Sequence, residues 1–126
     1  MLMEARDLAD ELGRMRDALR EMELETISSP NMDGMPAGSS DGDGIGRRLA
    51  RIESMRAKVE REEGRLERLR KRCMGYIRGL RAAERMFLTA YYLDAEKAVR
   101  AAMIARISDK TAGRYIKRIE KKEAGD

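Results

Sequence analysis

The chain has 126 residues and a formal net charge of +4; 40% of its residues are charged and 4% are aromatic, with one Phe and no Trp. So little bulky apolar material argues against a wide core, whereas the abundant Ala, Leu, Met, Arg, Lys and Glu all favour helices. The composition therefore predicts an all-α protein in which a small domain is attached to an elongated helical segment.

The residue types argue against several functional classes. The chain contains no His, the commonest general base at neutral pH, and no Ser, Thr or Cys lies in a recognisable nucleophile motif. We therefore expect neither an enzyme nor a cofactor. The single cysteine, Cys73, cannot form an intrachain disulfide and has no His or second Cys nearby for zinc. A buried thiol in a reducing compartment is the simplest interpretation.

No apolar run is long enough to suggest a membrane protein. A transmembrane helix needs about 18 consecutive apolar residues, and the first residues alternate charged and apolar types where a signal peptide would have an apolar core. We expect a cytoplasmic protein with no membrane partner.

The charge is unevenly distributed along the chain. Residues 1–27 carry 4 Arg against 8 acidic residues, and residues 28–46 add 3 Asp. Residues 47–82 carry 13 Lys and Arg against 5 Glu, and residues 83–126 carry 10 against 7. The acidic N-terminal part and the basic C-terminal part could attract each other, or the basic part could bind nucleic acid. Both interpretations can hold together.

The first predicted element, residues 1–27, is a coiled-coil helix. Its apolar residues recur at alternating steps of three and four, which keeps a single stripe facing a partner helix. The stripe consists of Ala5, Leu8, Leu12, Met15, Leu19 and Met22.

Residues 28–46 are rich in Gly, Ser, Asp, Asn and Pro, which predicts a flexible linker. Asp33, Asp41 and Asp43 raise the alternative of a calcium loop. Their spacing matches no EF-hand, and no Glu stands at the twelfth place after Asp33. We therefore favour a connector and expect no metal site.

Residues 47–82 form the second predicted helix, with a seam repeating every seven residues. A second apolar row, Met55, Leu69 and Tyr76, is interrupted at Arg48 and Glu62. This helix must pack against another helix. Residues 1–27 offer a matching apolar stripe on a segment of opposite net charge. We expect an antiparallel hairpin, formed within one chain or exchanged in a homo-oligomer. The sevenfold row contains Ile45, Ile52, Val59, Leu66, Cys73 and Leu80.

Residues 83–126 form the third predicted region, a small helix-turn-helix domain. Most of the aromatic residues lie in residues 83–93, where we expect the compact core. Two shorter helices follow, at about residues 95–105 and 109–122, and Ser108 is a natural N-cap for the second.

The last helix has two different faces. Ala112, Ile116 and Ile119 are spaced to turn inward, while basic residues occupy the other surface. This pattern fits a DNA-recognition helix, and it also fits an ordinary basic C-terminal helix. The basic surface consists of Lys110, Arg114, Lys117, Arg118 and Lys121.

Several short motifs extend this interpretation. They are Ala83-Glu84-Arg85, Tyr91-Tyr92-Leu93-Asp94, Ala101-Ala102 and Ser108-Asp109-Lys110-Thr111-Ala112, with Gly34-Met35-Pro36-Ala37-Gly38 further forward. Together they resemble the sigma-factor region 4 module of small phage and prophage regulators, including late-gene activators of the ArpU and RinA kind. Those relatives carry an Asp-Gly turn after the Tyr-bearing helix and usually Gly in the helix-turn-helix turn, where this chain has Arg106.

The resemblance implies a transcriptional regulator that binds double-stranded DNA, with RNA polymerase as a further candidate partner. The last helix would enter a major groove, with Lys110, Thr111 and Arg114 near base edges and the later cations on phosphates. The full expected DNA-binding set is Ser108, Lys110, Thr111, Arg114, Lys117, Arg118 and Lys121.

Two other functions remain open from the sequence. Small terminase subunits of phage DNA packaging also join a helix-turn-helix to helical oligomerisation segments, and a ring of eight or more subunits would favour that role. A coiled-coil interaction protein without DNA binding is the second alternative, and failure to bind any duplex at low salt would support it.

Overall fold

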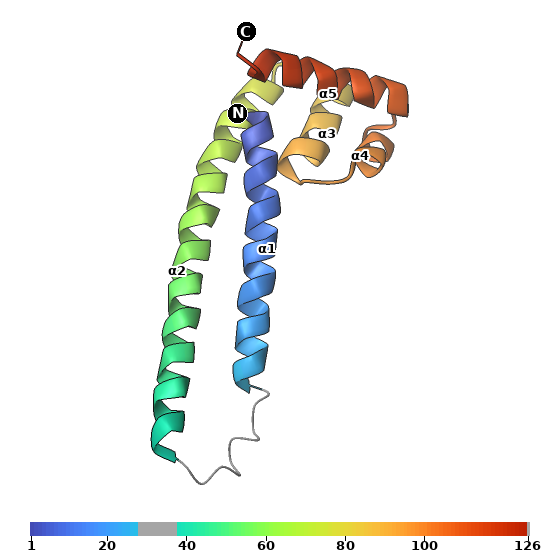
Figure 1. The fold of residues 1–126 in the computed structure, drawn as a ribbon. Helices are drawn as coiled ribbons and strands as arrows, with labels where there is room; N and C mark the ends of the chain where they lie inside the picture. The colour runs from blue at the N-terminus through green and yellow to red at the C-terminus, as the bar shows by residue number, and fades with distance from the viewer. Residues whose placement is uncertain (28–37, 126) are drawn as a thin grey trace. The chain divides into compact units, whose positions relative to one another are not determined.

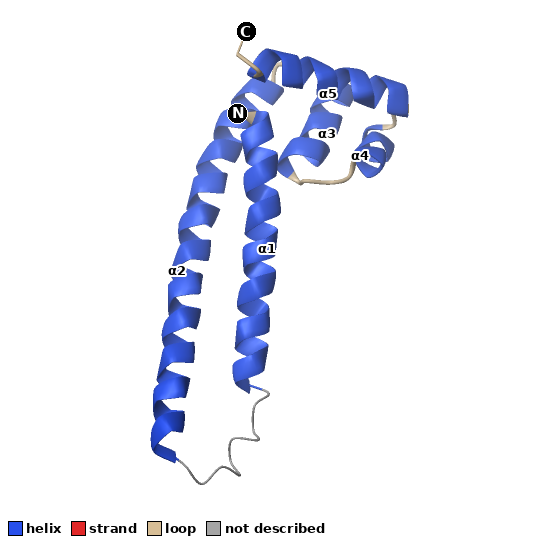
Figure 2. Cartoon of the chain, viewed as in Figure 1, coloured by secondary structure: helices blue, strands red, loops and turns tan. Residues whose placement is uncertain are grey.

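The computed structural model describes residues 1–27 and 38–125, and in this part of the chain every regular element is a helix (Figures 1 and 2). The all-α class is therefore confirmed. None of the helices described is long and apolar enough to cross a membrane. The elements are α1 (Leu2–Ile27), α2 (Gly38–Ile77), α3 (Ala82–Leu88), the π-helix η2 (Thr89–Leu93), α4 (Ala98–Ala105) and α5 (Asp109–Glu123).

The boundaries of α2 differ from the sequence prediction at both ends. Residues 38–46, which we expected to belong to the linker, are helical, and α2 ends at Ile77, whereas we expected the helix to reach residue 82. Extending an existing helix costs far less than nucleating one, so isolated glycines such as Gly44 and Gly46 do not stop it. Residues 28–37 of the predicted linker, including Asp33, lie outside the described residues.

The chain divides into two compact units, and the division falls within both long helices. Unit 1 comprises Met1–Glu11 and Gly64–Asp126, and unit 2 comprises Leu12–Glu63. The consecutive segments expected from the sequence, 1–27, 47–82 and 83–126, therefore do not match the compact units. Both chain ends contribute to unit 1.

Unit 2 is an antiparallel helical hairpin. Its inward-facing side chains include Leu12 and Met15 from α1 and Ile52 and Val59 from α2, all buried as the seam predicted. Ile45 does not follow the prediction: it is 42% exposed.

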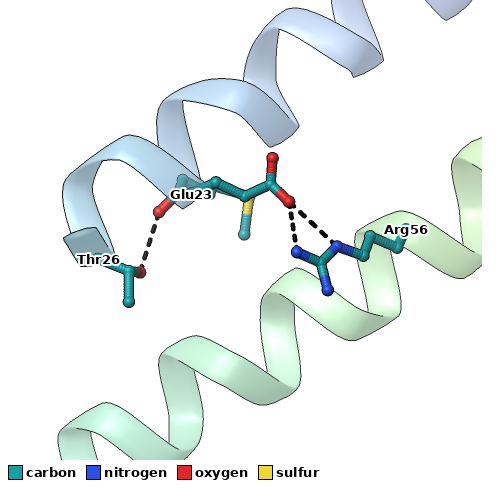
Figure 3. A network of polar contacts seen from close by, with 4 residues as sticks. Glu23, Thr26 and Arg56 are labelled. Atoms are coloured by element: carbon teal, nitrogen blue, oxygen red, sulfur yellow. Dashed lines mark hydrogen bonds and ion pairs between the residues drawn. The ribbon is translucent and has the colours of Figure 1, made fainter.

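Ion pairs show the direction of the two helices in unit 2. Arg16 donates to Glu63 at 2.6 Å, while Arg56 donates to Glu23 at 2.5 Å, so later residues of α1 meet earlier residues of α2. Figure 3 shows the Arg56 guanidinium donating two hydrogen bonds to one oxygen of Glu23. On α1, Thr26 closes the last turn by donating its hydroxyl to the Met22 carbonyl (Figure 3).

Replacing Leu12 by Ala should lower the free energy of unfolding by about 2–5 kcal/mol, because the truncation leaves a cavity in a packed seam. Leu12 is 0% exposed, whereas Leu49 of the same unit is 48% exposed. The matched Leu49→Ala variant should therefore change stability by less than about 0.5 kcal/mol. Urea denaturation measures both values, and equal losses would contradict this account of the seam.

Unit 1 contains the aromatic core that the sequence placed in residues 83–93. The rings of Phe87 and Tyr91 stack at 5.6 Å between centroids, and the Tyr92 ring meets Tyr91 edge-on at 4.8 Å. Phe87 also contacts Tyr115 of α5 at 5.9 Å. The buried residues around these rings are Leu2, Ala5, Leu8, Leu69, Cys73, Ile77, Leu88, Ala90, Leu93, Ala101, Ala102, Ala105, Ala112 and Ile119.

Cys73 is a packing residue of this core, as its place in the sevenfold row predicted. It is fully buried and forms no disulfide. Burial disfavours the thiolate and raises the pKa of the Cys73 thiol. The side chain therefore acts as a small apolar group and not as a reactive nucleophile.

The first turns of α1 are fixed within unit 1 by two charged contacts. Arg6 lies 4.0 Å from the centroid of the Tyr91 ring and donates to the carbonyls of Tyr91 and Glu96, the latter at 2.9 Å. Glu123, at the end of α5, accepts from the backbone N–H groups of Leu2 at 2.8 Å and Met3 at 2.9 Å. The carboxylate thus caps the start of α1, where unpaired N–H groups and the helix dipole favour an anion.

Replacing Glu123 by Gln should weaken unit 1 in a pH-dependent way. Burial alone would raise the pKa of Glu123, but the N–H groups of Met3 and Leu2 and the N-terminal ammonium outweigh it and lower that pKa. A lowered pKa in the folded state means that the stabilisation is present at neutral pH and is lost as pH falls through that pKa.

Thermal melting of the two proteins between about pH 7 and pH 3 tests this expectation. The wild type should melt at a higher temperature than Glu123→Gln at neutral pH, and the difference should shrink in acid. A difference that is constant across this range would show that the Glu123 charge does not stabilise the fold.

Candidate nucleic-acid interface

The helix-turn-helix expected from the sequence is formed by α4, residues 106–108 and α5, all within unit 1. Ser108 is the N-cap of α5, as predicted: its Oγ accepts from the Thr111 backbone N–H at 3.1 Å. The Ser108 hydroxyl also donates to the Thr111 hydroxyl at 3.0 Å. The bond from the Thr111 N–H satisfies one of the unpaired N–H groups at the helix start and defines where α5 begins.

The end of α4 closes with a Schellman motif. The Ile107 N–H donates to the Ala102 carbonyl at 3.0 Å, and the Arg106 N–H donates to the Met103 carbonyl at 3.2 Å. Arg106 has φ 56° and ψ 46°, the left-handed conformation that usually belongs to Gly at this position. The turn therefore keeps the geometry that glycine normally provides, although an arginine occupies it.

The inner face of α5 packs on the unit 1 core and sets the orientation of the helix. Ala112 and Ile119 are buried, and Ile116 and Tyr115 are half-buried against the same cluster. This confirms the three inward positions predicted from the spacing. Figure 1 shows α5 lying across α3 and α4.

The outer face of α5 carries four cations in one row. Lys110, Arg114, Lys117 and Lys121 are all exposed. At about 100° per residue, their steps of four, three and four place them within an arc of about 60° and over about 16 Å of helix. Within the described part of the chain, none of these four forms an ion pair, so their charges are available to an external anion.

Arg118 lies at the edge of this row and has a different partner. It donates to the Glu84 carboxylate of α3 at 2.8 Å, and its guanidinium lies 5.8 Å from the centroid of the Tyr115 ring. Glu84 is only 7% exposed, so its charge requires a counter-ion. The predicted phosphate contact of Arg118 remains a prediction, while the structure shows it joining α5 to α3.

Sequence reasoning placed Thr111 near base edges, and the structure places it in the first turn of α5, half-buried, with its hydroxyl bonded to Ser108. The structural roles of Glu84, Arg6 and Glu123 were missed. Each of the three joins segments distant in sequence, and local spacing gives no signal for such contacts.

Comparison of the chain with protein-family models, with curated proteins and with solved structures found no match in any of the three.

Replacing Arg106 by Gly should raise the free energy of unfolding by about 0.5–1 kcal/mol. A side chain in the left-handed region costs roughly 1–2 kcal/mol, and the greater freedom of glycine in the unfolded chain offsets part of the gain. Arg106→Ala is the control, since it removes the charge and keeps the strain. Denaturation should show a gain for the glycine variant alone; a loss would mean that the turn does not adopt this conformation.

Proposed function

We propose that this chain binds double-stranded DNA through α5 and regulates transcription of phage or prophage genes in the cytoplasm of a bacterial host. In this proposal the chain is not an enzyme and needs no cofactor. The row of four exposed cations, on a helix whose opposite face is buried in a core, carries the proposal.

The dimensions of α5 suit the major groove. That groove is about 12 Å wide, and a helix with its side chains is about 10–12 Å across. Because Ala112 and Ile119 anchor the inner face of α5 in the core, the outer face is exposed to a ligand without any unfolding of the helix. Lys110 and Arg114, in the first turns of α5, would lie near base edges, as recognition helices read DNA with their N-terminal residues. Lys117 and Lys121 would contact phosphates.

The backbone supports the resemblance to region 4 modules. Two residues other than glycine have positive φ in the described chain, Ala95 at 55° and Arg106 at 56°. Ala95 follows Asp94, where the relatives carry an Asp-Gly turn, and Arg106 lies in the turn where they usually carry Gly. The backbone therefore has the left-handed conformation at both places where those relatives use glycine.

Substitutions along α5 should differ in kind. Arg114→Ala should cost about 1–3 kcal/mol of binding free energy on a preferred sequence and much less on random DNA, because a guanidinium matches a guanine edge only where guanine is present. Lys117→Ala and Lys121→Ala should weaken binding to both duplexes. Each should lower the slope of log K against log salt concentration by roughly one, because each phosphate contact releases about one counterion.

Selection from a random library supplies the preferred sequence, and fluorescence anisotropy at several salt concentrations measures the affinities. Arg118→Ala is a useful comparison, since loss of the Glu84 pair should lower the melting temperature, while Lys117→Ala should leave it unchanged. If the library yields no enriched sequence and Arg114→Ala, Lys117→Ala and Lys121→Ala behave identically, the result would contradict sequence-specific regulation and favour a packaging role.

A further inference from the structure

The part of α2 that belongs to unit 1, residues 64–77, has a buried face and an exposed face. Leu69, Cys73 and Ile77 are buried in the core. On the opposite side, Arg68, Lys71 and Arg72 are exposed. At about 100° per residue they occupy an arc of about 100° centred away from the core. We call these three residues the α2 basic face.

The cations beside this face already have partners. Arg65 donates to Glu4 at 3.0 Å, and Arg70 donates to the Leu93 carbonyl at 2.8 Å and lies 3.6 Å from Asp94. In contrast, no residue in the described ranges forms an ion pair with Arg68, Lys71 or Arg72. The arginines at the flanks hold unit 1 together, whereas the three central charges have no such role.

Two glycines lie on the same exposed side. A Cβ at Gly75 would meet no atom within 4 Å, and one at Gly64 would meet only the end of the Arg68 side chain at 3.5 Å. Packing within the chain therefore does not require glycine at either position, although glycine weakens a helix relative to alanine. The exposed Gly75 leaves the helix backbone open to close approach by a partner beside the cations.

The C-terminal end of α5 lies near the segment of α2 that carries the basic face. The Lys122 ammonium lies 3.8 Å from the centroid of the Tyr76 ring. Tyr76 comes one helical turn after Arg72 on α2, so the C-terminal end of α5 lies against the segment that carries the α2 basic face. A duplex bound along α5 toward Lys121 would therefore lie near this part of α2.

We propose that Arg68, Lys71 and Arg72 form a second contact surface for the phosphates of the same DNA duplex, independent of base sequence. This inference rests on the proposed function of α5. The three residues span about 6 Å of helix, and a DNA strand carries a phosphate about every 3.4 Å along the duplex axis. The three side chains can therefore contact neighbouring phosphates of one strand. The exposed side of residues 64–77 carries no large apolar residue, which a membrane-binding helix would need.

The test compares two full-length double variants that each lose two positive charges. Arg68→Gln with Lys71→Gln removes charge from the α2 basic face, and Arg14→Gln with Arg20→Gln removes it from exposed positions of α1 in unit 2. The probe is a random-sequence duplex of about 30 base pairs in KCl from about 50 to 200 mM. The α2 pair should lower the salt slope by about 2, and the α1 pair should leave it near the wild-type value.

The outcomes separate this inference from the proposed function. If Lys117→Ala and Lys121→Ala lower the affinity for the duplex but the α2 pair leaves the affinity and the salt slope unchanged, the second surface is overturned and the role of α5 stands. An equal loss in both pairs would also overturn it, since net charge alone would then explain the effect. A wild-type chain that binds no duplex would contradict the proposed function itself. Circular dichroism confirms that each variant is folded.

Discussion

The position of α5 depends on a small aromatic cluster. The chain has one Phe, four Tyr and no Trp, and Phe87, Tyr91, Tyr92 and Tyr115 contact one another in unit 1. With so little large apolar material, the remaining contacts in the core use alanines on α4 and α5, which bring the helices close together. The cluster holds the inner face of α5 and thereby determines which residues of α5 face the solvent.

Two groups of cations in unit 1 have different surroundings. Arg6, Arg70 and Arg118 bind carbonyls, a ring or carboxylates within the unit, so they join α1, α2 and α5 to the helices around η2. Lys110, Arg114, Lys117 and Lys121 on α5, with the α2 basic face, have no ion-pair partner in the part of the structure described. Exposed charges add little to stability, and in our proposal the second group binds the phosphates of DNA.

Local patterns in the sequence predicted most of the individual helices but not how they assemble. Heptad spacing identified the buried positions Leu12 and Val59, and the residue type of Ser108 identified the start of α5. The spacing along α5 also separated its inner and outer faces. No local pattern showed that the first turns of α1 would pack with the C-terminal helices, because Arg6 and Glu123 act over long separations. The left-handed Arg106 and the early start of α2 oppose intrinsic preferences, which tertiary contacts and helix continuity can override.

We propose that DNA contacts the outer face of α5 and the α2 basic face. Backbone amide shifts of the full-length chain, followed by NMR during titration with duplex DNA, test it most directly. We expect shifts along Lys110–Lys121 and Arg68–Arg72, with the amides of the buried seam of unit 2 around Val59 unchanged. Saturable binding that shifts the amide signals of unit 2 and leaves those of α5 unchanged would contradict DNA binding through α5.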